Sequence, residues 1–115
     1  MDDIDKLKEV PLFGDMDDGE IAGILAIMGR NTFVPGQVII REGEQGDYFH
    51  VITEGTVDFL TCDAHGQELV LDDAGPGGYF GELSMLTGEV RTLRVRARDR
   101  VSTLVLDRKQ FHNFL

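Results

Sequence analysis

Residues 80–92 read Phe-Gly-Glu-Leu-Ser-Met-Leu-Thr-Gly-Glu-Val-Arg-Thr and place a glycine, a carboxylate and an arginine around one short helical turn. A glycine adopts φ angles that other residues resist, so its backbone can approach a ligand closely. The turn that follows directs free N–H groups and the positive end of a helix dipole towards an anion. Glu82 can accept hydrogen bonds from sugar hydroxyls, and Arg91 can bind a phosphate through its planar set of donors. The stretch therefore predicts a binding site for a sugar that carries a phosphate, and it contains no visible catalytic machinery.

The strand that follows this stretch assigns Arg91 to the interior. Alternate residues of a strand share a face, and Arg91 has the parity of an apolar set. A buried guanidinium requires a carboxylate or a phosphate as its partner. The residues alone leave both open, since Glu82 or Glu89 could form a salt bridge with it. The apolar set is Leu93, Val95 and Ala97, whereas Arg94, Arg96 and Arg98 have the opposite parity and are expected to form a solvated face.

Upstream of this stretch, short apolar or alternating segments are separated by turn signals. A Pro-Gly pair at 35–36 and a Glu-Gly pair at 54–55 are typical of turns, and residues 63–66 close a further hairpin. Many short strands joined in this way indicate an antiparallel barrel or roll. We therefore expect a mainly β protein, an antiparallel β-roll of the double-stranded jelly-roll type, flanked by short α-helices at both ends. The expected strands span residues 38–41, 48–53, 56–62, 67–72, 92–97 and 101–106.

Helical spacing marks the two ends of the chain. Apolar residues recur at this spacing between Ile21 and Met28, and Asp15 or Asp17 can cap the helix. Gly29 is expected to end it in the usual C′ position. The expected organisation is one domain, 1–115, made of a helical segment 1–30, a β-roll 31–106 that contains the binding stretch 80–92, and the start of a C-terminal helix, 107–115.

Composition limits the classes of function. The length of 115 residues suits one domain, and the formal net charge of −10 argues against nonspecific binding of nucleic acid or anionic membranes. Five of the 11 Lys and Arg residues lie between Arg91 and Arg100, which predicts a local positive region beside the binding stretch. The single cysteine, Cys62, excludes an internal disulfide. The sequence shows neither a membrane-spanning apolar run nor a signal peptide, so a cytoplasmic location is expected.

The stretch 80–92 resembles the phosphate-binding cassette of the cyclic-nucleotide-binding domain family. That family includes the regulatory subunits of cyclic-AMP-dependent kinase, cyclic-nucleotide-gated channels and the bacterial catabolite activator protein. Its pattern runs Phe-Gly-Glu-Leu, then a small or apolar stretch, then Arg-(Ser/Thr/Ala)-Ala and an alternating strand. Here residues 80–83 and 91–97 occupy those positions. The turns at Pro35-Gly36, Glu42-Gly43, Gly46-Asp47 and Gly55-Thr56-Val57 also match, so the resemblance covers about residues 10–115.

The resemblance implies a role for each residue of the cassette. Glu82 would bind the ribose 2′-hydroxyl, which separates ribonucleotides from deoxyribonucleotides. Arg91 and the backbone N–H groups around the glycine would hold the phosphate. Thr92 would touch the phosphate and, in some relatives, guanine, which hints that cyclic GMP is tolerated. The cassette residues implied to bind ligand are Gly81, Glu82, Leu83, Ser84, Arg91 and Thr92.

Phe59 and Leu71 complete the expected site. They have inward parity on facing strands and could pack against a purine, although they are equally good core residues. We expect cAMP or cGMP as the ligand, no cofactor and no metal. The expected function is that of a regulatory sensor domain, which couples ligand binding to a downstream effector domain or protein. The family's long C-terminal helix, which covers the purine, is missing from residues 1–115; it would influence the choice of base and could mediate a dimer.

Two departures from the family pattern favour an alternative, a degenerate domain of the same fold that acts as a protein-interaction module. Leu93 stands where the family usually has a small residue, and Glu89 adds a negative charge to the loop. A cupin-like metalloenzyme would need His-x-His spacing, which the histidines lack. Cys62 is conceivable as a haem ligand but reads as an ordinary strand residue. The three histidines are His50, His65 and His112.

Overall fold

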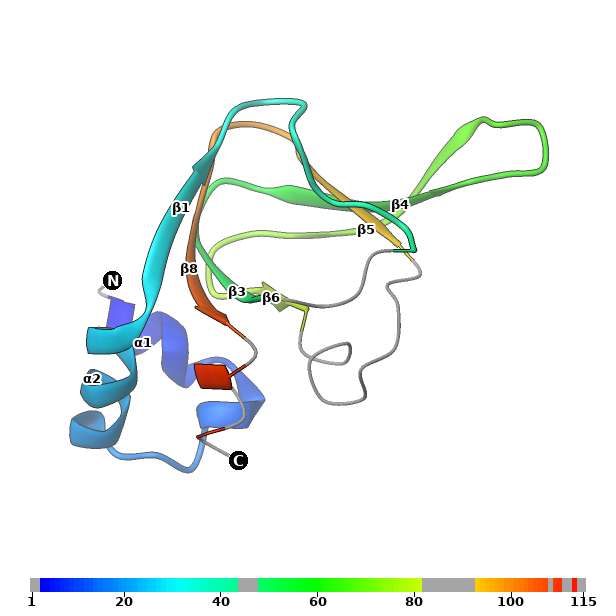
Figure 1. Ribbon diagram of the computed structural model, residues 1–115. Coiled ribbons are helices and arrows are strands. Elements are labelled where there is room, and N and C mark those ends of the chain that lie inside the picture. The colour runs from blue at the N-terminus through cyan, green and yellow to red at the C-terminus, as the bar shows by residue number, and fades with distance from the viewer. Residues whose placement is uncertain (1–2, 44–47, 82–92, 108, 111–112, 114–115) are drawn as a thin grey trace.

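Two antiparallel sheets of four strands each form a roll in the computed structural model, which describes residues 3–43, 48–81, 93–107, 109–110 and 113 (Figure 1). The strand orders are β1-β8-β3-β6 and β2-β7-β4-β5. The predicted mainly β roll with flanking helices is confirmed. The helices are α1 (Asp3–Lys8), the 3₁₀ helix η1 (Pro11–Phe13) and α2 (Asp18–Ile27). The strands are β1 (Gly29–Phe33), β2 (Val38–Ile40), β3 (Tyr48–Glu54), β4 (Val57–Cys62), β5 (Glu68–Ala74), β6 (Tyr79–Phe80), β7 (Arg94–Ala97) and β8 (Val101–Asp107).

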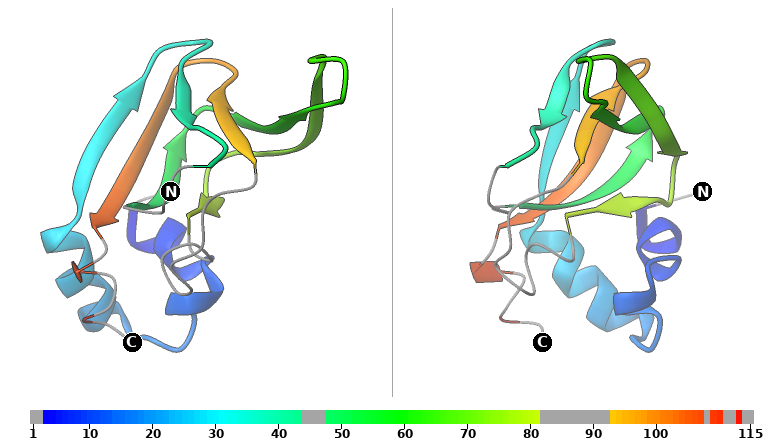
Figure 2. Two further views of the ribbon diagram at one scale, coloured as in Figure 1. Left: turned by 45° about the vertical axis from the view of Figure 1, so that its right-hand side comes forward. Right: turned by 90° about the vertical axis from the view of Figure 1, so that its right-hand side faces the viewer.

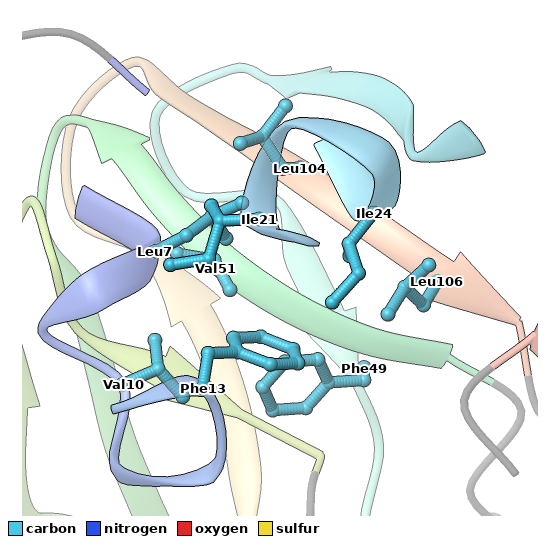
Figure 3. Packing of buried hydrophobic residues seen from close by; sticks show 9 residues of the cluster. All are labelled: Leu7, Val10, Phe13, Ile21, Ile24, Phe49, Val51, Leu104 and Leu106. Atoms are coloured by element: carbon cyan, nitrogen blue, oxygen red, sulfur yellow. The ribbon is translucent and has the colours of Figure 1, made fainter. Parts of the chain in front are cut away.

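The helices pack against one face of the first sheet. They gather at one end of the roll, and the β4–β5 hairpin extends from the opposite end (Figures 1 and 2). Figure 3 shows Phe13 of η1 beside Phe49 of β3, with ring centroids 6.0 Å apart in an edge-to-face arrangement. Burial of such a cluster supplies most of the free energy that holds the helices to the sheet. The buried cluster consists of Leu7, Val10, Phe13, Ile21, Ile24, Phe49, Val51, Leu104 and Leu106.

The opposite faces of β3 and β8 point into the roll, towards the second sheet. Strand residues alternate between faces, so Phe49 and Val51 contact the helices while Ile52 contacts the interior of the roll. β3 and β8 are thus covered on both sides, which explains why they are apolar along most of their length. The interior cluster consists of Ile40, Ile52, Val57, Phe80, Val95, Ala97 and Val101.

The start of α2 follows the sequence prediction, but its end does not. Asp17 is the N-cap: its side chain accepts a hydrogen bond from Glu20 N at 2.8 Å, and the Glu20 side chain completes a capping box. The predicted C′ role of Gly29 is wrong. Met28 caps the helix in an extended conformation, and Gly29 opens β1 opposite Val105. An added Cβ at Gly29 would lie 3.1 Å from Val105 Cγ2, so close packing of strands accounts for this glycine.

Residues 109–110 after β8 are helical, and the predicted C-terminal helix at 107–115 stays a prediction because most of it lies outside the described residues. Asp107 and Gln110 cap each other: Gln110 N donates to Asp107 Oδ1 at 2.8 Å, and Asp107 N donates to Gln110 Oε1 at 3.0 Å. The Gln110 amide also donates to the carbonyl of Ile27, at the end of α2, at 3.1 Å. This contact joins the chain just after β8 to the end of α2, and Figure 2 shows residues 109–110 beside the N-terminal helices. None of the helices in the described part of the chain is long and apolar enough to cross a membrane.

Candidate ligand-binding site

The predicted cassette lies between two described ends, Gly81 and Leu93. Gly81 has φ +94°, a conformation that side-chain-bearing residues resist and that the sequence led us to expect of this glycine, while its contact with a ligand stays a prediction. The other predicted cassette residues, Glu82, Leu83, Ser84, Glu89, Arg91 and Thr92, lie outside the described residues.

The entrance to the cassette is fixed by the pairing of β6 with β3. His50 pairs with Phe80 across this ladder, and their rings stack with centroids 4.6 Å apart and planes 13° apart. Nδ1 of the buried His50 lies 3.1 Å from Oγ1 of Thr103 on β8. This stack and hydrogen bond hold Phe80 inside the roll, directly before Gly81. His50, one of the three histidines that lack metal-binding spacing, is thus packed inside the roll.

A glycine turn at 75–78 brings the chain to β6 and touches the helical segment. Gly77 N donates to Ile52 O at 2.9 Å, and Ile52 N donates to Gly78 O at 2.8 Å. The Glu9 carboxylate, just after α1, lies so close to Gly77 that an added Cβ there would collide with it. The helical segment therefore contacts the part of the chain that directly precedes the cassette.

The exit from the cassette is fixed by β7, which lies between β2 and β4. Val95 and Ala97 are buried in the interior cluster and Leu93 is partly buried, so the predicted apolar parity is confirmed for the two strand residues. Phe80 and Val95 belong to the same interior cluster. The chain thus leaves and re-enters the roll beside a single apolar interior, and residues 82–92 connect these two points.

Phe59 and Leu71, the predicted purine contacts, have different environments. Phe59 packs against the interior cluster, with its ring centroid 6.2 Å from that of Phe80. Leu71 is 59% exposed, and the expectation that it packs inward is wrong. The ladder between β4 and β5 shifts register here, from Phe59–Asp72 to Leu60–Val70, so Leu71 occupies a bulge without a partner in register. Contact of either residue with a ligand remains a prediction.

Arg94 and Arg96 of β7, together with Arg98 just after the strand, lie on the outer face of the second sheet. Each is paired with a carboxylate. Arg94 Nε donates to Glu42 Oε1 at 2.8 Å, and Arg96 forms an ion pair with Glu68. Because each is paired, the local positive region predicted from the sequence is wrong for these arginines. Arg98 completes the row with Asp58 and Asp73, whose oxygens lie 2.6 Å and 2.7 Å from its Nη2.

These pairs shift the titration of the groups involved. The hydrogen bonds that Arg98 donates to Asp58, and then the one that it donates to Asp73, raise the pKa of Arg98. The hydrogen bond with Glu42 raises the pKa of Arg94 in the same way. The pKa of Glu42 is lowered by the hydrogen bond from its own backbone N–H and then by Arg94. These shifts favour the charged forms of Glu42, Arg94 and Arg98. The carboxylates of this face satisfy its arginines without an external anion.

Groups for metal or acid–base chemistry are dispersed. Within the described ranges, no three His, Cys, Asp or Glu side chains gather closely enough to hold a metal ion. His65 and Cys62 are exposed near the tip of the β4–β5 hairpin, far along the chain from the buried His50. His112 lies outside the described residues. The arrangement at the cassette therefore offers an apolar interior, a left-handed glycine and nearby backbone groups, which suit binding.

Sequence reasoning missed two contacts close to this site. The Glu42–Arg94 pair could not be predicted, because strand parity indicates which face of a sheet a residue occupies but not which residue it pairs with across the sheet. The contact of Gln110 with Ile27 could not be predicted either, because the two residues are far apart in the sequence. The spacing of Asp107 and Gln110, however, was a capping signal that the sequence contains.

Comparison with known proteins points to one kind of domain. The sequence model described as "Cyclic nucleotide-binding domain" matches residues 30–115. A cAMP-dependent protein kinase regulatory subunit from Blastocladiella emersonii is 30% identical over 109 residues, which are 95% of this chain and 27% of that protein. The chain therefore spans only about a quarter of the length of this relative.

Solved structures show the same similarity. The N-terminal domain of a transcriptional regulator from Streptomyces coelicolor A3(2) superposes with a TM-score of 0.88 and 33% identity, covering 96% of this chain and 77% of that chain. The regulatory subunit of a cAMP-independent protein kinase A from Trypanosoma cruzi, bound to guanosine, gives a TM-score of 0.85 and 32% identity, covering 96% of this chain and 39% of that chain.

Proposed function

The chain belongs to the cyclic nucleotide-binding domain family, and from this we propose that it binds cAMP or cGMP between β6 and β7 and regulates an effector. The observation that carries the proposal is the geometry of the two cassette ends. Phe80 and Val95 enter one interior cluster, and Gly81 has the left-handed conformation that allows close approach of its backbone. A ligand bound here would lie against an apolar interior that can receive a base.

The roles of individual residues follow from their chemistry. Arg91 neutralises the cyclic phosphate through charge-assisted hydrogen bonds. Backbone N–H groups from Gly81 to Ser84 share that phosphate, and Glu82 accepts a hydrogen bond from the ribose 2′-hydroxyl. Thr92 adds a hydroxyl beside the phosphate. Phe59 and the exposed Leu71 offer apolar surface to the purine.

Regulation requires that ligand binding changes the conformation of the helices at the two ends of the chain. The helical segment contacts the turn before the cassette through Glu9, and it contacts the start of the C-terminal helix through Ile27 and Gln110. A ligand that prefers one arrangement of these helices shifts the population towards it. The proposed effector is another domain or another protein. The Blastocladiella emersonii relative is a regulatory subunit of a cAMP-dependent protein kinase, and the Streptomyces coelicolor relative is a domain of a transcriptional regulator, so a kinase and a transcriptional regulator are both candidate effectors.

Isothermal titration calorimetry of the 115-residue chain with cAMP, with cGMP and with guanosine tests the proposal. We expect a cyclic nucleotide to bind, and ligand at 1,000 times its Kd to stabilise the fold by about 4 kcal/mol in a thermal shift. Guanosine is included because a relative 32% identical binds it in a crystal. If guanosine binds more tightly than either cyclic nucleotide, the proposed ligand becomes a nucleoside in place of a cyclic nucleotide. Failure of all three to bind would favour a protein-interaction module.

A further inference from the structure

The chain that follows β2 meets the start of β7, where the chain leaves the cassette, on the outer face of the second sheet. β2 ends at Ile40 and pairs with Val95 of β7, and this is the last backbone pair between them on the cassette side. Beyond it, Arg94 Nε donates to Glu42 Oε1 at 2.8 Å. Arg94 is the first residue of β7 after the cassette, and Glu42 lies two residues beyond the end of β2. The side-chain pair therefore continues the contact of the two strands after the ladder has ended.

We propose that Glu42 and Arg94 form a positioning clamp for the cyclic-nucleotide site. The clamp joins the chain that follows β2 to the chain that leaves the cassette, and so holds the start of β7 in place before ligand arrives. A site whose flanking backbone is already held in place loses less conformational entropy on binding, and this lowers Kd without any contact between clamp and ligand. The inference rests on the proposed function and adds a determinant of its affinity.

The position of this pair distinguishes it from the other ion pairs on the same face. Arg96 pairs with Glu68 of β5, and Arg98 pairs with Asp58 of β4 and Asp73 of β5. Backbone ladders already connect these strands, because β7 pairs with β4 from Val57–Ala97 to Leu60–Arg94 and β4 pairs with β5. Removal of these ion pairs leaves the backbone pairing in place. The ladder between β2 and β7 is different, because it contains only two registered pairs with an irregularity between them. A side-chain contact at its end is therefore not redundant.

The surroundings of Glu42 and Arg94 favour an ion pair with a fixed geometry. The two side chains are 28% and 30% exposed, so water screens them only in part. Glu68 Oε1 on β5 lies 3.9 Å from Arg94 Nη1. The guanidinium therefore lies within ion-pair distance of two carboxylates, one in the chain that follows β2 and one on β5. Exposed pairs of this kind couple two groups by a factor of about 2 to 5 in an equilibrium constant.

A double-mutant cycle with ligand affinity as the readout tests the clamp. Glu42→Gln and Arg94→Gln remove each charge while keeping much of the side-chain volume, and the double variant removes both. The matched control is Asp73→Asn, which removes a carboxylate from Arg98 on the same face without touching Glu42 or Arg94. Affinity for cAMP and cGMP is measured by calorimetry at low and high salt, and the melting temperature of each ligand-free variant is recorded.

The clamp predicts that each single variant raises Kd by about 2- to 5-fold, that the double variant raises it no further, and that high salt reduces the difference. Asp73→Asn should change the melting temperature about as much and leave Kd unchanged. An unchanged Kd in Glu42→Gln, additive losses in the double variant, or an equal loss in Asp73→Asn would each overturn the clamp alone. A parent chain that binds neither nucleotide overturns the proposed function, and the clamp falls with it.

Discussion

Replacing Gly81 by alanine tests whether the conformation of the cassette entrance matters for binding. The backbone at Gly81 has φ +94°, and an alanine held there is strained by about 1–3 kcal/mol. Alanine also reduces the entropy of the unfolded chain, which offsets about 0.4–1 kcal/mol. The expected net loss is therefore about 1–2 kcal/mol. It is measured as lower stability if the strain persists in the ligand-free protein, and as weaker binding if it is released there and returns with ligand.

Gly36 provides the matched control, because it has nearly the same conformation, φ +85°, in the turn between β1 and β2, with no atom within 4 Å of an added Cβ. Urea denaturation gives the stability of each variant, and calorimetry with cAMP gives its affinity. Gly36→Ala should lose stability and retain the parent Kd. In Gly81→Ala the loss of stability and the loss of binding free energy should sum to about 1–2 kcal/mol. If all of it falls on binding, Kd rises by a factor of about 5 to 30. A Gly81→Ala variant with parental stability and parental affinity would refute the reasoning.

Three further perturbations probe the helices and the charged face. Phe13→Ala should lower the free energy of unfolding in urea by about 3–5 kcal/mol because it empties a fully buried aromatic position, whereas Leu69→Ala, at a 45% exposed position, should change it by less than about 0.5 kcal/mol. The pKa of Glu42 is lowered in the folded protein, so its stabilisation should be present above the ordinary pKa of a glutamate and be lost as pH falls through the lowered pKa. The difference in free energy of unfolding between the parent and Glu42→Gln should therefore vanish in acid. A difference that persists there would contradict the ion pair of Glu42 with Arg94. Gln110→Ala should cost about 1 kcal/mol and speed amide exchange at the start of the C-terminal helix, since its cap and its bond to Ile27 are both lost; unchanged exchange would show that this cap is dispensable.

The sequence was most informative where a single residue type has a strong local preference. The strands of the roll and their parity could be predicted because apolar residues alternate between glycine turns, and Val95 and Ala97 proved buried as expected. Asp17 was one of two candidate caps, and the capping box with Glu20 decides between them. Gly81 has the left-handed conformation that its place in the motif implied.

The sequence failed where neighbours distant in the chain decide the outcome. Gly29 looks like a helix stop, yet its contact with Val105 on β8 places it in a strand. Leu71 has inward parity only if β5 is regular, and the bulge beside Phe59 removes that condition. The outer arginines looked like a positive surface because their carboxylate partners, such as Asp58 on β4, come from other strands. Such pairings depend on register, which residue preferences alone do not specify.

The most direct test of the central claim compares the affinities of the parent chain and of Arg91→Ala for cAMP and for adenosine, measured by calorimetry, with Arg91→Lys as the conservative variant. Because Arg91 is proposed to bind the cyclic phosphate by charge-assisted hydrogen bonds, its loss should weaken cAMP about 10- to 100-fold and leave the affinity for adenosine, which lacks the phosphate, unchanged. Lysine should restore part of the loss. If Arg91→Ala binds cAMP as tightly as the parent does, the phosphate is not held by this cassette and the account is contradicted.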